Sequence, residues 1–329
     1  MNYSKFLKYL KPLLRFIRNL LILLVVILLG VGTWWTYRVF SRPWKMHKEE
    51  QLASGARYER RVWKEPRPAL IHIIKLDLTK VKVEEILITP PNSSRGLEHL
   101  ADFTSEFAKA NDVDIAINGS FYTPCHTHRV WDFYPQQGEP VDIMATAIYD
   151  GVQYSAPEQR KQQRHVLYWE QDRFKTFRDG EAPEGVKFAL PGGDLLVKNG
   201  KSEPLTHRRT NSYAPRSGIG WDAEGKKIWL IVVDGRQPRY SVGVNLQEFA
   251  KMFADLGAEE ALNLDGGGSS TLVAFKKGKH RILNAPIHRR VPMNERPVPN
   301  HLGFKLKLRT DASQGQKVAQ SDANQPQEE

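Results

Sequence analysis

A run of uncharged, mostly apolar residues near the N-terminus decides how this chain can fold. From Asn19 to Tyr37 the sequence holds no Asp, Glu, Lys or Arg and is rich in Leu, Val and Ile. About 18 such residues are enough to span a bilayer as a helix. The segment is apolar all round, unlike a helix that buries one face against a soluble core. The sequence therefore predicts one transmembrane helix at residues 19–40.

Charges and aromatic residues on either side favour one orientation of this helix. Five basic residues between Lys5 and Arg18 precede it, which favours a cytoplasmic N-terminus, and Trp34 and Trp35 mark the opposite interface. A cleaved signal peptide is the alternative, but Gly30-Val31-Gly32 before two Trp residues is a poor cleavage site. We expect a single-pass anchor with the C-terminal domain outside the cytoplasm, in the periplasm or at the cell surface.

Positive charge is concentrated around the same segment. The chain carries a net charge of +11, and residues 1–50 hold nine Lys or Arg against two Glu, which leaves only +4 for residues 51–329. A nucleic-acid partner is therefore not expected. Cys125 is the only cysteine, so no intrachain disulfide can form.

The predicted organisation has five parts. Residues 1–18 form a cytoplasmic basic N-terminus, 19–40 the anchor, 41–68 a polar, Pro-containing stalk, 69–309 the functional domain, and 310–329 a disordered tail with almost no apolar content. Within the domain, alternation of apolar and polar residues predicts a strand pair at 71–78 and 81–88 and a hairpin at 217–221 and 227–233. Apolar residues at helical spacing predict a helix over about 96–110. We expect an α+β fold with a mixed β-sheet core and a few helices.

One strand–helix–strand unit stands out. The apolar strand Ile228–Val233 ends at Asp234, Asn245 caps a helix that stops at Gly257, and the strand Ala261–Leu264 ends at Asp265. Such a unit predicts a parallel β-α-β crossover. Both acids would then lie at the carboxyl-terminal edge of the sheet, where α/β folds place ligands.

The turn after the second strand has an unusual composition. Asp265 is followed by Gly266-Gly267-Gly268 and then by Ser269-Ser270-Thr271. Three consecutive glycines are costly to order, so they indicate backbone conformations closed to other residues or a close approach by a ligand. Consecutive N–H groups in such a turn can form an anion-binding concavity. The alternative is a tight hairpin with a solvated Asp.

Five motifs follow one another along residues 70–308. They are Asn118-Gly119-Ser120-Phe121, Pro215-Arg216-Ser217-Gly218-Ile219-Gly220, Val233-Asp234-Gly235-Arg236, Leu262 through Thr271, and Arg296-Pro297-Val298-Pro299-Asn300. Together, in this order, they resemble the phosphodiester glycosidase family, whose bacterial members are often labelled exopolysaccharide-biosynthesis proteins. The resemblance implies hydrolysis of a sugar-1-phosphodiester, similar to an N-acetylglucosamine-1-phosphodiester, at the glycosidic C1–O bond.

A site for that reaction needs carboxylates, donors for phosphate oxygens and contacts to sugar hydroxyls. Asp265 and Asp234 are the candidate catalytic carboxylates. The candidate substrate-binding residues are Asn118, Arg216, Arg236, Gly266, Gly267, Gly268, Ser269, Ser270, Arg296 and Asn300. In this hypothesis the glycine amides and serine hydroxyls hold the phosphate, and Arg236 or Arg216 clamps it. Each could instead serve the fold. The acids and Asn118 would then be turn residues, Arg236 and Arg216 would form surface salt bridges, and Arg296 and Asn300 would make hydrogen bonds that anchor a loop.

No cofactor is required by this chemistry, and no metal site is predicted. Asp234 and Asp265 on one edge could hold Ca²⁺ or Mg²⁺. Cys125-His126-Thr127-His128 suggests zinc, but no second ligand cluster accompanies it.

Two other function classes remain open at this point. The protein could be an anchored, non-catalytic binding or assembly factor for an anionic polysaccharide, or a phosphodiesterase that attacks phosphorus.

Overall fold

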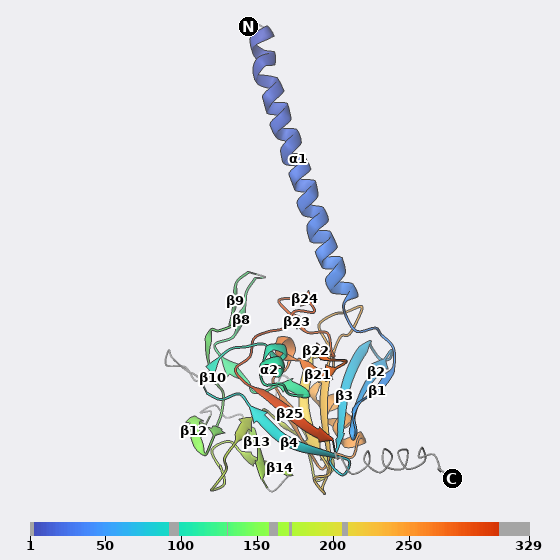
Figure 1. The fold of residues 1–329 in the computed structure, drawn as a ribbon, viewed down its shortest axis with the longest axis vertical. Helices are drawn as coiled ribbons and strands as arrows, with labels where there is room; N and C mark the ends of the chain where they lie inside the picture. The colour runs from blue at the N-terminus through green and yellow to red at the C-terminus, as the bar shows by residue number, and fades with distance from the viewer. Residues whose placement is uncertain are drawn as a thin grey trace, which may run out of the picture. The chain divides into compact units, whose positions relative to one another are not determined.

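The structure is a computed structural model, and it describes residues 3–91, 99–129, 131–157, 164–170, 173–205 and 210–308 (Figure 1). The chain divides into two compact units, Met1–Arg42 and the part that begins at Pro43. The tail predicted at 310–329 lies outside the described residues.

The first unit consists of one helix, α1 (Tyr3–Phe40). In the segment Pro12–Phe40, the most apolar stretch of 18 residues has a mean hydropathy of 2.4, and none of that stretch is buried. In the part of the chain that the structure describes, it is the one helix long and apolar enough to cross a membrane. The anchor predicted at 19–40 lies within it.

In its described residues the second unit is mostly β-sheet, with two further α-helices. The largest sheet has eight strands, in the spatial order β1 (Lys48–Ala53), β2 (Ala56–Trp63), β3 (Ala69–Asp77), β19 (Lys227–Val233), β18 (Arg216–Trp221), β20 (Glu260–Leu264), β16 (Leu195–Lys198) and β17 (Lys201–Ser202).

Two five-stranded sheets accompany it. One has the order β22 (Lys279–Ile282), β21 (Leu272–Lys276), β6 (Ile115–Asn118), β25 (His301–Leu308) and β4 (Val81–Ile88). The other has the order β12 (Val152–Ser155), β11 (Ala147–Tyr149), β15 (Ala189–Pro191), β13 (His165–Glu170) and β14 (Arg173–Arg178).

Short strands and helices complete the unit. A three-stranded sheet joins β5 (His99–Leu100), β10 (Pro140–Ile143) and β7 (Tyr122–Thr123), and two hairpins pair β8 (His126–Thr127) with β9 (Phe133–Tyr134) and β23 (Ile287–His288) with β24 (Val291–Pro292). The helices in the described part of this unit are α2 (Thr104–Ala110), α3 (Leu246–Asp255) and the 3-10 turn η1 (Gly267–Ser269).

The central strands of the eight-stranded sheet are buried on both faces. In β19, Leu230 belongs to the main core, which includes residues of β6, β21 and β25 from the first five-stranded sheet. Ile231 points to the opposite face and packs with α3. Because successive side chains of a strand alternate between faces, a strand covered on both sides is apolar throughout, as Ile228–Val233 is.

Helix α3 lies close to β18 because β18 carries glycines. A Cβ added at Gly218 would come within 3.0 Å of the Phe249 ring, and one at Gly220 within 2.7 Å of the Phe253 ring. Both phenylalanines are fully buried, and each burial contributes about 1.5–3 kcal/mol. Asn245 caps the helix in a capping box with Glu248, as its sequence position predicts.

The α+β fold class is confirmed. The predicted crossover joins β19 to β20 through α3, but these two strands are not neighbours in the sheet. All pairings between the named strands are antiparallel, including β18 with β19 and β18 with β20. Strands β19 and β20 therefore run in the same direction with β18 between them. The hairpin predicted at 217–221 and 227–233 is confirmed as β18–β19.

Three other predictions need correction. β3 and β4 exist but do not pair, because β3 lies between β2 and β19 while β4 pairs with β25. The segment 41–68 is no stalk, since β1 and β2 pair along the edge of the largest sheet and the compact unit begins at Pro43. The helix predicted over about 96–110 is shorter, Thr104–Ala110, and residues 92–98 lie outside the described residues.

Candidate active site

The candidate site lies at one end of three central strands of the eight-stranded sheet, where β19 and β20 finish and β18 starts. Asp234 follows β19, Asp265 follows β20, and Arg216 begins β18 between them. The register places Arg216 opposite the last residue of β19, and Ser217 opposite the last residue of β20. The fold thus brings these chain segments, far apart in sequence, to the same edge.

The glycine turn after β20 forms the 3-10 turn η1. Gly267 has φ +65°, a conformation that residues with a side chain rarely adopt. Its amide donates to the Pro215 carbonyl at 2.9 Å, and the Ser269 amide donates to the Gly266 carbonyl at 3.2 Å. The sequence predicts that the amides of Gly266, Gly267 and Gly268 bind phosphate. The Gly267 amide is already hydrogen-bonded within the protein.

Asp265 forms the centre of a cluster of polar groups. Its Oδ2 accepts a hydrogen bond from the Ser269 hydroxyl at 2.5 Å and lies 3.3 Å from Nη2 of Arg296. Nη2 of Arg296 also donates to Ser269 Oγ at 2.6 Å and to the Gly266 carbonyl at 3.3 Å. Both charged side chains are about one-seventh exposed. Arg296 is thus committed to holding Asp265 and the turn.

Burial and charge act in opposite directions on the Asp265 carboxyl. Burial raises its pKa above the ordinary value, while Arg296, Ser269 and the Gly266 amide partly offset the rise. Burial would lower the pKa of Arg296, but surrounding groups, among them Asp265, outweigh burial and raise it. The result is a partly desolvated carboxylate beside a permanent cation, which can accept a proton or stabilise a developing positive charge.

Arg236 differs from the other two predicted arginines. It lies in the turn after β19 with φ +57°, and it is exposed. A Cβ added at Gly267 would lie 2.9 Å from its guanidinium. The guanidinium therefore packs directly against Gly267, in space that a side chain would fill. Although part of the side chain reaches solvent, the neighbouring protein partly desolvates the guanidinium, and this desolvation together with the nearby charge of Arg296 lowers its pKa. Among the described residues, its side chain has no hydrogen-bond or ion-pair partner.

Arg216, in contrast, is bound by its own surroundings. Its Nε donates to the Val244 carbonyl at 3.2 Å, and its Nη2 donates to the Ser212 carbonyl at 2.7 Å. Burial and Arg236 lower the pKa of Arg216 to about 10. Of the three arginines, Arg236 is the one left free to bind an anion.

Asp234 is buried and hydrogen-bonded within the protein. Its side chain is fully buried, with Oδ2 at 3.0 Å from Nε2 of His72 and Oδ1 accepting from the Ala285 amide at 2.8 Å. His72 Nδ1 in turn lies 2.9 Å from the Tyr58 hydroxyl. Asn284 donates both to Asp234 Oδ1 and to the Ser270 carbonyl. Asp234 is therefore linked to the residues after the glycine turn through Asn284 and the Ser270 carbonyl.

The predicted asparagines also serve as internal supports. Asn118 donates to the Asp265 carbonyl at 2.6 Å and accepts from the Ser217 hydroxyl and the Thr271 amide. Asn300 accepts from the Ser120 amide at 2.7 Å. Both are fully buried, so they hold strands together beneath the site.

Buried hydroxyls lie beside these supports. The Ser270 hydroxyl and the Thr271 hydroxyl are buried with no partner in the described part of the chain. The structure thus places the Ser270 side chain, predicted to bind phosphate, inside the protein.

Sequence reasoning missed several neighbours of the cluster. Nδ1 of His288 would lie 3.4 Å from a Cβ added at Gly268, and burial together with Arg296 and Arg289 lowers the pKa of His288 to about 3. Its Nε2 has no partner among the described residues. Nothing in the local sequence around 288 signals this contact, because it depends on the β23–β24 hairpin folding back onto η1.

Two more missed residues come from the loop-rich middle of the chain. Arg164 is buried, lies 4.8 Å from the centroid of the Phe121 ring, and acts to lower the pKa of Asp265. The Cys125 thiol accepts from Nη1 of Arg296 at 3.4 Å and is exposed. Phe121 belongs to a motif identified from sequence, whereas Arg164 follows a segment with no recognisable pattern.

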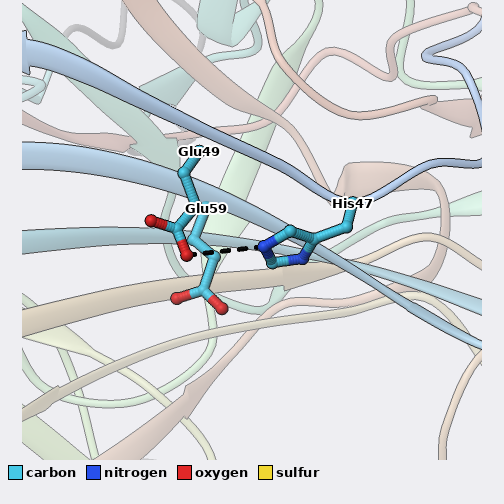
Figure 2. A group of neighbouring side chains, drawn as sticks. All are labelled: His47, Glu49 and Glu59. Carbon is cyan, nitrogen blue, oxygen red and sulfur yellow. Dashed lines mark ion pairs between the residues drawn. The ribbon is translucent and has the colours of Figure 1, made fainter.

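The structure offers one group of possible metal ligands within its described residues, and it lies elsewhere. His47, Glu49 and Glu59 place three ligand atoms within 4.8 Å of one another (Figure 2). Arg57 pairs with Glu49, and Lys75 pairs with Glu59 at 2.6 Å. These cations already neutralise the carboxylates, so the group is an ion-pair network on β1 and β2.

The Cys-His segment forms no such group. His126 stacks on His128 with ring centroids 4.7 Å apart, and its Nε2 lies 3.7 Å from Asp132. A groove of about 320 Å³ lies at the far end of β18 and β20, beside Trp221 and Glu260, away from Asp265.

Comparison with known proteins gives one family. The family described as phosphodiester glycosidase matches residues 111–305, more than half of the chain. The chain is 29% identical over 97 residues to bovine N-acetylglucosamine-1-phosphodiester alpha-N-acetylglucosaminidase, which covers 27% of this chain and 18% of that protein. It is also 29% identical over 142 residues to the uncharacterised SPbeta prophage-derived protein YomE of Bacillus subtilis, covering 39% of this chain and 21% of that one. The chain thus matches only about a fifth of the length of these relatives.

Solved structures share the fold. The catalytic domain of zebrafish N-acetylglucosamine-1-phosphodiester alpha-N-acetylglucosaminidase, described as auto-inhibited by its pro-peptide, superposes with a TM-score of 0.55 at 22% identity, over 82% of this chain and 92% of that one. A Burkholderia pseudomallei protein described as exported superposes with a TM-score of 0.51 at 15% identity, over 72% and 74%. At these identities the likeness concerns the fold alone.

Proposed function

Since the chain belongs to the phosphodiester glycosidase family, we propose that it hydrolyses a sugar-1-phosphodiester, with an N-acetylglucosamine-like sugar, at the C1–O bond. One observation carries this proposal: a partly desolvated carboxylate, Asp265, and an unengaged cation, Arg236, lie on the same glycine turn. The substrate joins a phosphate, which needs a cation, to an anomeric carbon, which becomes positive as its bond breaks.

The roles of the residues follow from their contacts. Arg236 binds the phosphate oxygens, and Asp265 activates the attacking water or stabilises the oxocarbenium-like carbon. Arg296 and Ser269 hold one oxygen of Asp265 in place. The C1–O bond breaks with its electron pair moving to the phosphate oxygen, and water supplies the hydroxyl of the released sugar. Asp234 is a positioning residue that acts through Asn284 and the Ser270 carbonyl.

The setting proposed is extracytoplasmic glycan or exopolysaccharide metabolism at a membrane. The apolar segment of α1 supports an anchor, and the basic residues before Asn19 favour a cytoplasmic N-terminus. The catalytic unit, from Pro43 onwards, would then face the periplasm or the cell exterior.

An isotope experiment tests the reaction. The full-length protein in detergent is incubated with an N-acetylglucosamine-1-phosphodiester in ¹⁸O-water, and mass spectrometry locates the label. We expect ¹⁸O in the sugar. Asp265→Asn keeps the shape and most hydrogen bonds of the side chain, so it should reduce kcat by about 10²–10⁴-fold without unfolding the protein.

The matched control is Asp255→Asn, which removes the same charge from the exposed end of α3 and should leave the rate unchanged. Label in the phosphate would identify a phosphodiesterase that attacks phosphorus. No turnover of several sugars, together with binding of an anionic polysaccharide, would identify a non-catalytic binding factor.

A further inference from the structure

The chain enters the catalytic unit at a fixed point. Pro43 is the first residue of that unit, and its carbonyl accepts a hydrogen bond from the Tyr240 hydroxyl at 2.7 Å. Two residues later, Nζ of Lys45 donates to the Arg239 carbonyl at 3.0 Å. The Met46 carbonyl accepts from Nε of Arg60 at 3.0 Å. The entry segment is therefore bound to the loop between β19 and α3.

That loop is also part of the candidate active site. It starts at Asp234 and carries Arg236, whose amide donates to the Val242 carbonyl to close the turn. At the turn, Gln237 donates to the Ala285 carbonyl at 3.1 Å, just before β23. Only three residues separate Arg236 from Tyr240. The residues that bind the entry segment, Arg239 and Tyr240, thus lie on the same short loop as Arg236.

The connection to the apolar helix is very short. Helix α1 ends at Phe40, and Pro43 already belongs to the catalytic unit. Three residue steps span at most about 11 Å of fully extended chain. If α1 crosses a bilayer, the loop that holds Pro43 cannot lie far from the membrane surface, whatever angle the two units adopt.

Exposed aromatic and basic side chains occur at the entry segment and on the hairpin beside the site. Trp44 is 77% exposed and Trp131, between β8 and β9, is 75% exposed. The Arg129 guanidinium lies 5.9 Å from the Trp131 ring. The β8–β9 hairpin reaches the site because Phe133 contacts His288, with ring centroids 5.3 Å apart. Figure 1 shows β8–β9 and β23–β24 projecting at one end of the catalytic unit. Tryptophan and arginine together are typical of surfaces at a membrane interface.

We propose that the substrate is a membrane lipid whose headgroup is a sugar-1-phosphodiester, taken from the bilayer that holds α1. This deepens the proposed function and rests on it and on the anchor. Arg236 binds the headgroup phosphate at the membrane surface, while Trp131 enters the interface beside the lipid. Hydrolysis breaks the C1–O bond, water supplies the sugar hydroxyl, and the lipid keeps a phosphomonoester.

The test compares two esters of N-acetylglucosamine-1-phosphate that differ only in the alcohol. The hexadecyl ester inserts into vesicles of phosphatidylethanolamine and phosphatidylglycerol, and the methyl ester stays in solution. Full-length protein is reconstituted in the same vesicles, and sugar release is measured for both. Because anchor and substrate share one surface, we expect kcat/KM for the hexadecyl ester to be higher by about 10-fold or more.

Two variants locate the membrane contact. Trp131→Ala should reduce the rate on the hexadecyl ester by about 3–10-fold and leave the rate on the methyl ester within about twofold of the unaltered protein. Val152→Ala is the matched control, because Val152 is a 65% exposed apolar residue on β12, which is in a different sheet. It should change neither rate.

The outcomes separate the two proposals. Equal rates on both esters would overturn the lipid substrate and leave the glycosidase proposal standing. Hydrolysis of neither ester would overturn the glycosidase proposal and the lipid substrate with it. A hexadecyl preference to which Trp131 contributes no more than Val152 would overturn the assigned membrane surface.

Discussion

The side chain next to Arg296 makes stability depend on pH. Oε2 of Glu295 accepts from the Ser105 amide at the start of α2, at 3.1 Å. Burial raises the pKa of Glu295 to about 7, the hydrogen bonds from Ser105 oppose the rise, and Glu106 and Asp102 add to it. In the unfolded chain this pKa is near the ordinary value of about 4.3. Between about pH 4.5 and pH 7, Glu295 therefore keeps a proton in the folded protein that it has released in the unfolded chain.

We predict that Glu295→Gln flattens the dependence of stability on pH. A raised folded-state pKa contributes stability that is complete below about pH 4.5 and is lost as pH rises through 7. Gln keeps the acceptor for Ser105 without a charge. The variant should match the unaltered protein at pH 4.5 and be more stable by roughly 1–3 kcal/mol at pH 8. Urea unfolding at a series of pH values measures this.

Glu84→Gln is the matched control, since Glu84 is an exposed side chain on β4. It should follow the pH dependence of the unaltered protein throughout. Equal stability of Glu295→Gln and the unaltered protein at pH 8 would contradict the assigned pKa of Glu295.

Single residues show what the sequence can and cannot predict about the site. The sequence singles out Asp265 as a candidate because an acid, three glycines and hydroxyls follow a strand. The sequence could not tell which arginine is free, because Arg216 is bound by carbonyls of Ser212 and Val244 that only the fold brings near. Asp234 looked equivalent to Asp265, but its partner His72 comes from a strand more than 150 residues away.

At the scale of elements, the glycine turn and Arg236 fit each other. We predict that Gly267→Ala reduces kcat/KM by about 10-fold or more, because the new methyl group would meet the Arg236 guanidinium at 2.9 Å. The positive φ adds about 1 kcal/mol of destabilisation. Steady-state kinetics and chemical denaturation measure the two effects.

Gly278→Ala is the control for backbone strain. Gly278 has φ +75°, and a Cβ there meets nothing within 4 Å. It should cost a similar amount of stability and leave the activity intact. If Gly267→Ala kept normal activity, the turn would not position Arg236 for the substrate.

Strands themselves were predictable, whereas their partners were not. Alternating apolar and polar residues identify β3 and β4 as strands. The same pattern fits any sheet with one buried face, so it does not determine which strands pair. Adjacent strands often pair, yet β3 and β4 separate into the two layers of the core. The β19–α3–β20 unit was located correctly, while the insertion of β18 depends on pairing across the sheet.

At the scale of the whole molecule, β1 and β2 belong to the folded unit. Ala56 and Tyr58 of β2 are buried in the main core, and Tyr58 also reaches His72. The polar composition of 41–68 concealed this, because an edge strand can be polar on its outer face. We predict that a chain beginning at Pro43 folds like the full-length protein, and that one beginning at Ala69 melts roughly 10 °C lower or aggregates.

Differential scanning calorimetry and size-exclusion chromatography distinguish the two shortened chains. Equal melting temperatures would mean that β1 and β2 add little to the stability of the sheet. A low melting temperature for both would show instead that the first unit is needed for folding.

The position of Cys125 gives the protein a built-in reporter. It is the only thiol in the chain, it is exposed, and it contacts the arginine that holds Asp265. A thiol-reactive fluorophore would therefore attach at one position without any engineered cysteine. Its emission, and the speed at which it attaches, would follow occupancy of the neighbouring site in real time.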